Sequence, residues 1–330
     1  MRERCLKTVT ELARTDERIV FIGSDLGVGV MADFKAAFPD RFFMEGVAEQ
    51  NLVGMAAGMA MEGRIVFLNT IATFLTRRCF EQVVVDLCMH NVNVRLIGNG
   101  GGVVYAPLGP THLATDDLAI MRSIPNMTII APADADEMAR AVRATVDYPG
   151  PVYIRVAKGH DPVVTSDTEE FQIGRGVPMR DGHDALIVTT GVGLQVCLAA
   201  ADQLTASGID ATVLHMPTVK PLDTESLTAA IERVPVVVTV EEHSIVGGLG
   251  SAVAEFLAEA DLLGLRKFRR IGFPDMFPSG YGDQAGMMRR HGISPDAVTA
   301  TVKELLVTRS RRRLSEINRS GLWPSFDRVV

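Results

Sequence analysis

The sequence predicts an α/β protein with two doubly wound, mostly parallel sheets. Short β-branched runs alternate with segments of helical spacing along most of the 330 residues, a pattern typical of parallel strands joined by helices. The strand candidates are almost continuously apolar, as expected for strands covered on both faces. The chain length favours two domains of roughly 150 residues each.

The first domain is expected over residues 1–160. A polar, amphipathic N-terminal helix leads into the strand "RIVFIG" (18–23). Further buried strands are predicted at 64–70, 93–98, 127–132 and 151–157, and helical spacing occupies 49–62, 78–90 and 135–148. The polar stretch 161–175 is the predicted linker, because it lacks the periodicity of either element.

The second domain is expected over residues 176–307. It contains strand-like runs at 184–192, 208–216, 234–243 and 267–275, and a closing helix at 294–307. Residues 308–330 are predicted to form an appended arm, with a basic run at Arg311–Arg313. Such a run can dock on a partner or an anionic surface, but we favour a solvated arm.

Composition restricts the class of protein. Hydrophobic residues make up 47% of the chain and the formal net charge is −7, which favours a folded core and disfavours general nucleic-acid binding. We find no apolar run long enough to span a bilayer and no signal-peptide pattern, so a cytoplasmic location is expected. The scattered cysteines are predicted to be reduced core thiols; they are Cys5, Cys79, Cys88 and Cys197.

One acidic residue stands out. Glu49 begins a segment otherwise rich in Gly, Ala, Met and Val, "GVAEQNLVGMAAGMA" (46–60), and burying an ionised carboxylate alone costs several kcal/mol. A helix N-terminus would favour an acid there through the helix dipole. The other explanation is that the acid serves chemistry, and the flanking motifs must decide between the two.

Those motifs resemble a known family. The segments "FFMEGVAEQNLVGMAAGMAMEGRIVFLNTIATFLTRRCFEQV", "GPTHLATDDLAIMRSIPNMTIIAPAD" and "GPVYIRVAKG" resemble the pyrimidine-binding domain of transketolases and of 1-deoxyxylulose-5-phosphate synthases. "TVKPLD" and "VEEHSIVGGLGSAVAE" are similar to the transketolase C-terminal domain. The resemblance extends over roughly residues 1–307 and implies a thiamine-diphosphate-binding fold followed by a transketolase C-terminal-like domain.

The resemblance implies a cofactor site. In this family, the glutamate at the position of Glu49 hydrogen-bonds the aminopyrimidine of thiamine diphosphate and so promotes proton removal from thiazolium C2. A dry, apolar setting suits a carboxyl group that shares its proton with a ring. Phe74 matches an aromatic residue that stacks on the pyrimidine, and Asp25 matches an aspartate near the cofactor.

It also implies substrate contacts. His112, in "GPTH", matches a histidine that faces the substrate and assists proton transfer. Arg155 matches an arginine that binds the phosphate end of the substrate. Arg77 stands at a position where transketolases often have an aromatic residue, and it is closer to the pattern of 1-deoxyxylulose-5-phosphate synthases. It is expected to meet a substrate phosphate or carboxylate, with a surface salt bridge as an equal alternative.

Two departures from the family pattern matter. Pro107 and Leu108 stand where transketolases have an acidic pair, which favours a less hydroxylated or bulkier substrate. The Gly-Asp-Gly…Asn motif that holds Mg²⁺ and the diphosphate is missing, since "YGDQAG" (281–286) and "RDGHD" (180–184) do not match it. A separate subunit is therefore expected to supply the diphosphate-binding domain and the magnesium ligands, in an α2β2 assembly with a homodimer-like core.

These features imply a thiamine-diphosphate-dependent transferase subunit. It would move a two-carbon ketol or acyl unit from a ketose or 2-oxo acid to an aldehyde. One alternative is the β subunit of a 2-oxo acid dehydrogenase, which has the same order of domains. The other is a non-catalytic interaction protein, against which the joint presence of Glu49, Phe74 and His112 argues.

Overall fold

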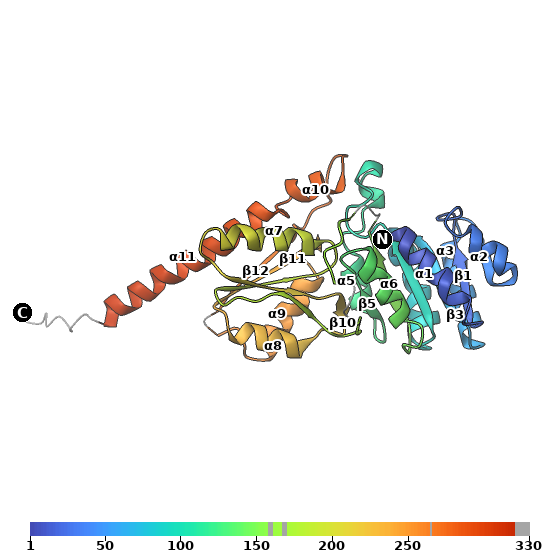
Figure 1. Cartoon of the computed structure of the whole chain (residues 1–330), viewed down its shortest axis with the longest axis horizontal. Coiled ribbons are helices and arrows are strands. Elements are labelled where there is room, and N and C mark those ends of the chain that lie inside the picture. Colours follow the sequence, from blue (N-terminus) through green and yellow to red (C-terminus); the bar gives the residue numbers. More distant parts are fainter. Residues whose placement is uncertain (158–160, 167–169, 265, 321–330) are drawn as a thin grey trace, which may run out of the picture.

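The computed structural model describes residues 1–157, 161–166, 170–264 and 266–320. Two mostly parallel sheets, each covered by helices on both faces, follow one another along the long axis of the molecule (Figure 1). The predicted fold class is confirmed. Each predicted strand is present, although the bounds differ by a few residues.

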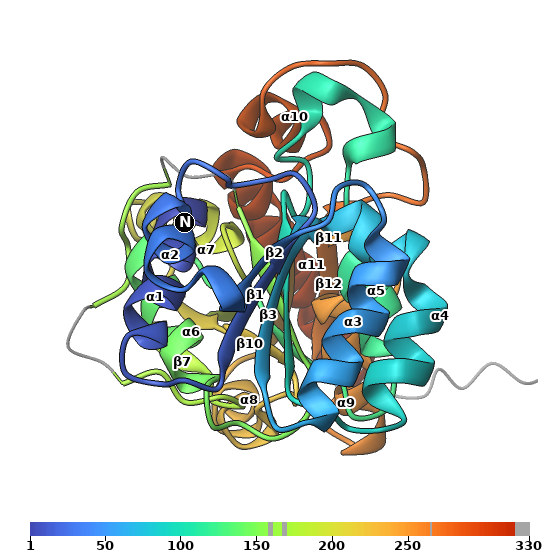
Figure 2. The same cartoon turned by 90° about the vertical axis from the view of Figure 1, so that its right-hand side faces the viewer.

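The first sheet has seven strands in the order β10-β5-β6-β4-β3-β1-β2. Along β1, Val20 and Ile22 face one helical layer while Ile19 and Phe21 face the other, as the two-residue period of a strand requires. Helices α1, α2 and α6 cover one face, and α3, α4 and α5 cover the other (Figure 2). The strands are β1 (Ile19–Gly23), β2 (Phe42–Met44), β3 (Ile65–Ile71), β4 (Val94–Asn99), β5 (Thr128–Ile130), β6 (Val152–Val156) and β10 (Thr218–Lys220); the helices are α1 (Arg2–Ala13), α2 (Ala32–Ala37), α3 (Glu49–Met61), α4 (Phe80–Gln82), α5 (Asp117–Arg122) and α6 (Ala135–Ala144).

The second sheet has five strands in the order β12-β11-β8-β9-β7, and the edge strand β7 runs antiparallel to β9. Helices α7 and α11 pack on one face and α8 and α9 on the other. The strands are β7 (Val177–Arg180), β8 (Ala185–Thr189), β9 (Ala211–His215), β11 (Val236–Ser244) and β12 (Lys267–Phe273); the helices are α7 (Gly193–Thr205), α8 (Thr224–Glu232), α9 (Leu249–Glu259), α10 (Gln284–Arg290) and α11 (Pro295–Ser320).

The two halves share backbone hydrogen bonds. Strand β10 follows β9 in sequence, yet it pairs antiparallel with β5 and forms the edge of the first sheet. The backbone N–H of Ala131 also donates to the carbonyl of Pro217 at 2.8 Å. The sequence did not predict β10, because a strand of three residues is too short to show a period.

The helix predicted at 78–90 is wound differently from an ordinary α-helix. Residues Phe74–Arg78 form a π-helical turn, η2, and Val83–Cys88 form a second, η3, on either side of α4. Each π turn accommodates a residue more than an α-helical turn does, and such turns often occur at functional sites. This winding begins at Phe74, shortly after β3.

Outside the two sheets, the predicted linker is partly fixed to the first domain, and the predicted arm begins as a continuation of the last helix. Within 161–175, Val164 and Thr165 donate their backbone N–H groups to the side chain of Asp134 at 2.8 and 2.7 Å, so this part of the linker is held against α6. The closing helix, predicted to end at 307, continues to Ser320 as α11 and projects from the body (Figure 1). The side chains of Arg311–Arg313 and the whole of 321–330 lie outside the described residues.

The cysteine prediction is confirmed. All four thiols are free and buried, and burial raises the pKa of each, from its usual 9.0 to about 12. Such thiols are protonated and unreactive at neutral pH.

Candidate functional site

The predicted cofactor residues meet at the carboxyl edge of the first sheet. Strands β1, β2 and β3 are parallel neighbours, so the segments that follow them emerge at the same edge. Asp25 follows β1, Glu49 begins α3 after β2, and Phe74 begins η2 after β3. In open parallel sheets this edge is where ligands bind, at the point where connections diverge to opposite sides.

Glu49 is buried at this edge. It is the first residue of α3, and its exposed fraction is only 1%. Next to it in space lies Arg78, whose Nη1 is 2.6 Å from Glu49 Oε2. The ion pair and the helix N-terminus together offset the cost of burying the carboxylate.

Arg78 also contacts Phe74. The guanidinium carbon lies 4.3 Å from the centroid of the Phe74 ring, within the range of a cation–π interaction. A flat nitrogen-containing group thus lies on the aromatic face and hydrogen-bonds the buried acid. The spacing of Glu49 and Phe74 therefore suits a flat nitrogen heterocycle, which is the shape and chemistry of an aminopyrimidine. The sequence did not single out Arg78, although it is the neighbour of the predicted Arg77.

His112 also contacts the Phe74 ring. The two rings meet edge to face with centroids 5.3 Å apart, and both side chains are partly exposed. His112 Nδ1 lies 2.9 Å from the hydroxyl oxygen of Thr111. The structure therefore brings Glu49, Phe74 and His112 together, with Arg78 in contact with both Phe74 and Glu49.

Arg77 holds the loop that carries His112. Its Nε and Nη2 donate to the two carboxylate oxygens of Asp116 at 2.9 and 2.7 Å, and Nη2 also donates to the carbonyl of Leu113 at 3.0 Å. This bidentate pair matches the salt-bridge alternative for Arg77. The pair is about one-third exposed or more on both sides, so it positions the loop at modest energetic benefit.

Asp25 lies in the loop after β1, and Ser24 donates its hydroxyl to it at 3.0 Å. Pro107 and Leu108 lie in the loop before His112, where Leu108 is 52% exposed. This loop packs beside the segment that contains Tyr281. The approach is close, since a β-carbon added at Gly109 would lie only 3.0 Å from the Tyr281 ring. Figure 2 shows the two segments together at the top of the molecule, near α10.

Arg155, which was predicted to bind the phosphate end of the substrate, is buried and paired within the chain, and its contact with a substrate stays a prediction. Its Nε and Nη2 donate to both carboxylate oxygens of Asp117 at 2.8 and 3.0 Å, and Nη2 donates further to the carbonyls of Ala114 and Glu242. The exposed fractions of the Arg155 and Asp117 side chains are 6% and 0%. The buried guanidinium joins the two halves of the chain instead of facing an open site.

Glu242 is a buried acid whose contacts the sequence did not predict. Its Oε1 accepts hydrogen bonds from the backbone N–H of Val103 and from Gln284 Nε2, both at 2.9 Å. Burial raises the pKa of Glu242 to about 7, although the Arg155 charge acts in the opposite direction. Tandem acids at the end of the predicted strand 234–243 were the available signal.

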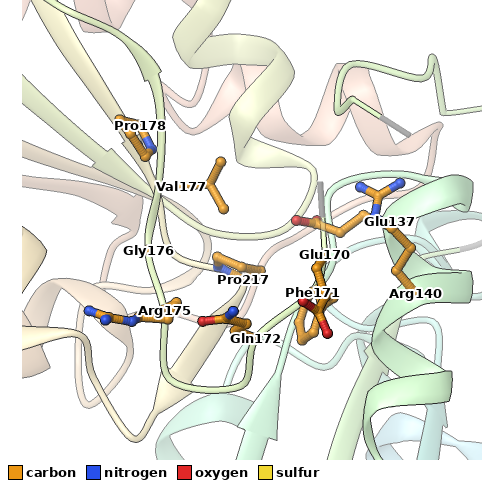
Figure 3. A pocket seen from close by; sticks show the side chains of 10 residues that line it. All are labelled: Glu137, Arg140, Glu170, Phe171, Gln172, Arg175, Gly176, Val177, Pro178 and Pro217. Atoms are coloured by element: carbon orange, nitrogen blue, oxygen red, sulfur yellow. The ribbon is translucent and has the colours of Figure 1, made fainter. Parts of the chain in front are cut away.

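A cavity of about 320 Å³ lies elsewhere, between α6 and the segment before β7 (Figure 3). Several of its charged side chains already have partners. Glu137 accepts a hydrogen bond from the N–H of Ala133 and contacts His215. Arg140 donates to the hydroxyl of Thr165, and Arg175 donates to the carboxylate of Glu225. Helix α6 covers the face of the sheet opposite α3. This cavity is therefore separate from the Glu49 site.

Within the described part of the chain, no group of three or more His, Cys, Asp or Glu side chains is arranged to hold a metal ion. Asp283 of "YGDQAG" instead caps α10 by accepting the N–H of Gly286 at 2.6 Å. No helix among these same residues combines the length and the hydropathy needed to cross a membrane.

Comparisons with known proteins agree with this architecture. Residues 1–162 match the family "Transketolase, pyrimidine binding domain" and residues 174–298 match "Transketolase, C-terminal domain". A putative transketolase C-terminal section from Methanocaldococcus jannaschii is 37% identical over 92% of this chain and 95% of its own length. One of the subunits of an apulose-4-phosphate transketolase from Phocaeicola vulgatus is 38% identical over 91% of this chain and 95% of its own.

One solved structure and one longer relative show the same correspondence. A split-gene transketolase, described as an inactive β4 tetramer, superposes with a TM-score of 0.84 at 37% identity, covering 93% of this chain and 97% of its own. The 1-deoxy-D-xylulose-5-phosphate synthase 1 of Geobacter sulfurreducens is 36% identical over 92% of this chain but only 47% of its own length. The chain therefore belongs to the transketolase family and corresponds to its C-terminal section, a pyrimidine-binding domain followed by a transketolase C-terminal domain.

Proposed function

We propose that this chain is one subunit of a thiamine-diphosphate-dependent transketolase. It would transfer a two-carbon ketol unit from a ketose to an aldehyde. In net terms one carbon–carbon bond of the donor breaks and one forms to the acceptor, so no oxidant is needed. The observation that carries this proposal is that the buried Glu49 carboxylate and the partly exposed Phe74 ring both contact Arg78 at the carboxyl edge of the sheet.

Thiamine diphosphate, when bound, supplies an acidic thiazolium carbon that can add to the substrate carbonyl. Glu49 would hydrogen-bond the ring nitrogen of the pyrimidine, and its burial keeps water from competing for that bond. Phe74 would fix the plane of the ring by stacking, with a contribution of about 1 kcal/mol beyond burial. His112, in contact with Phe74, would hold or move a proton at a substrate oxygen.

A second subunit is part of the proposal. It would carry the diphosphate-binding domain and the Mg²⁺ ligands, and we propose an α2β2 assembly with a homodimer-like core. Support comes from the names of full-length relatives, such as the apulose-4-phosphate transketolase that is divided into subunits. The solved split-gene relative described as an inactive β4 tetramer supports the view that chains of this type need a partner.

The substrate class follows from the loop before His112. Leu108 presents an apolar side chain that is 52% exposed, and an apolar group does not hydrogen-bond a sugar hydroxyl. We propose that the substrate has fewer hydroxyl groups at this position, or a bulkier group, compared with an ordinary sugar phosphate.

The test is reconstitution. The chain would be co-purified with a separately encoded protein that contains Gly-Asp-Gly…Asn, and ketol transfer to aldehydes would be measured with thiamine diphosphate and Mg²⁺. Glu49→Gln should lower turnover by at least about 100-fold while the complex still assembles. Unchanged turnover in Glu49→Gln would refute the role of Glu49. NAD-linked CoA acylation in place of ketol transfer would identify the chain as part of a 2-oxo acid dehydrogenase instead.

A further inference from the structure

We propose that Arg78 occupies the pyrimidine position in the free chain and must leave before the cofactor binds. This inference rests on the proposed function, because it concerns the same pair of residues. Arg78 makes both contacts expected of the ring: its Nη1 is 2.6 Å from Glu49 Oε2, and its guanidinium carbon is 4.3 Å from the centroid of Phe74. One group cannot share that space with another.

The pair compensates a local electrostatic problem. Glu49 is 1% exposed, at the start of an apolar helix, and an unpaired carboxylate there would be strongly unfavourable. Arg78 neutralises it through the ion pair of 2.6 Å. When a ring takes over the hydrogen bond, the guanidinium is no longer needed at Glu49.

The surroundings allow Arg78 to move. Its side chain is 39% exposed, whereas Glu49 is not, so the guanidinium can swing into solvent without crossing a packed core. Arg78 donates to the carboxylate of Glu49, whereas Arg77 is held by both Asp116 and Leu113. The π-helical turn η2 carries Phe74 and Arg78 at its two ends, which brings the guanidinium over the ring.

Arg78 is thus a competitor of the ring, not one of its ligands. Its presence should lower the affinity for an aminopyrimidine by the free energy needed to break the Glu49 contact. A hydrogen bond to a charged group typically corresponds to a change in affinity of about tenfold or more. A residue that held the ring would have the opposite effect.

The experiment uses the full-length free chain and a probe that carries only the ring, 4-amino-5-hydroxymethyl-2-methylpyrimidine. Its dissociation constant would be measured by ligand-observed NMR for wild type, Arg78→Met and Arg78→Lys. Arg78→Met keeps the aliphatic stem but removes the cation, so the probe should bind about tenfold more tightly than to wild type. Arg78→Lys keeps a cation for Glu49 without the flat guanidinium, and its affinity should lie between the two.

Arg41→Met is the matched control. Arg41 also stacks on a phenylalanine, with its guanidinium carbon 4.1 Å from the centroid of Phe38, but its guanidinium donates to backbone carbonyls. This variant should leave probe affinity unchanged. Circular dichroism would establish that each variant is folded. If Arg78→Met does not fold, Arg78→Lys still tests the inference.

The inference would be overturned if the Arg78 variants bound the probe no more tightly than wild type does. The absence of detectable binding to any of the variants would also overturn it. The proposed function is judged separately, by calorimetric binding of thiamine diphosphate to the complex with the partner subunit. If that binding depends on Glu49 while the Arg78 variants show no gain, only the inference fails. If the complex binds no thiamine diphosphate, the proposed function fails.

Discussion

The carboxylate of Glu242 accepts the backbone N–H of Val103 at 2.9 Å. This bond joins strand β11 of the second sheet to the loop after β4 of the first, the loop that continues to His112. The same carboxylate also accepts a hydrogen bond from Gln284 of α10. A single buried acid therefore connects three segments around the proposed substrate site.

Stability should depend on pH through Glu242. Burial raises its pKa from 4.5 to about 7, so between these values the folded chain keeps a proton that the unfolded chain releases. The contribution of Glu242 to the free energy of unfolding is therefore fully present below pH 4.5. It is lost as the pH rises through about 7, which lowers the free energy of unfolding by up to about 3 kcal/mol. Glu242→Gln should lose this dependence in urea unfolding measured across that range. Glu225→Gln, an exposed partner of Arg175, is the control, and parallel curves for wild type and Glu242→Gln would contradict the assignment.

The buried pair Arg155–Asp117 should contribute far more to folding than its exposed neighbour Arg77–Asp116. Asp117→Asn leaves the Arg155 charge buried without its counterion, for which a loss of about 3–5 kcal/mol is expected. Asp116→Asn removes an exposed pair and should cost less than about 1 kcal/mol. Denaturant unfolding of the two variants checks this, and equal losses would show that Arg155 is not anchored as described.

Gly102 is required by a close approach as well as by its backbone. Its φ is 68°, and a β-carbon there would lie 2.4 Å from the carboxyl carbon of Glu242. Gly46 has a similar φ of 73° but nothing within 4 Å. Gly46→Ala should therefore lose only about 1–2 kcal/mol through backbone strain, whereas Gly102→Ala should lose more. Thermal unfolding compares them; a smaller loss in Gly102→Ala would contradict the predicted clash.

His112 should affect catalysis and leave folding unchanged. In the reconstituted complex, His112→Asn should reduce kcat/KM by about 100- to 10,000-fold, the usual range for a lost proton-transfer group. Thr111→Val removes only the hydroxyl beside His112 Nδ1, and its effect should be about fivefold. Steady-state kinetics separates the two, and a full-strength effect of Thr111→Val would indicate that the loop, and not the imidazole, is responsible.

Local sequence patterns were enough to predict much of the fold. Buried strands such as 64–70 were predictable because a strand covered on both faces must be apolar at nearly every position. The family motifs around Glu49, Phe74 and His112 also indicated three residues that the structure brings to one edge of the sheet. Parallel strands explain this convergence, because their carboxyl ends meet at a common edge.

The sequence alone thus determined the fold class, the family and the position of the Glu49 segment. Only the tertiary structure decided which partners the charged side chains choose: Arg78 joins Glu49 across 29 residues, and Glu242 joins Val103 across 139. It also assigned Arg155 to Asp117 and β10 to the first sheet. The physical reason is that periodicity records the burial of each position, whereas an ion pair or an edge strand depends on segments that become neighbours only after the chain has folded.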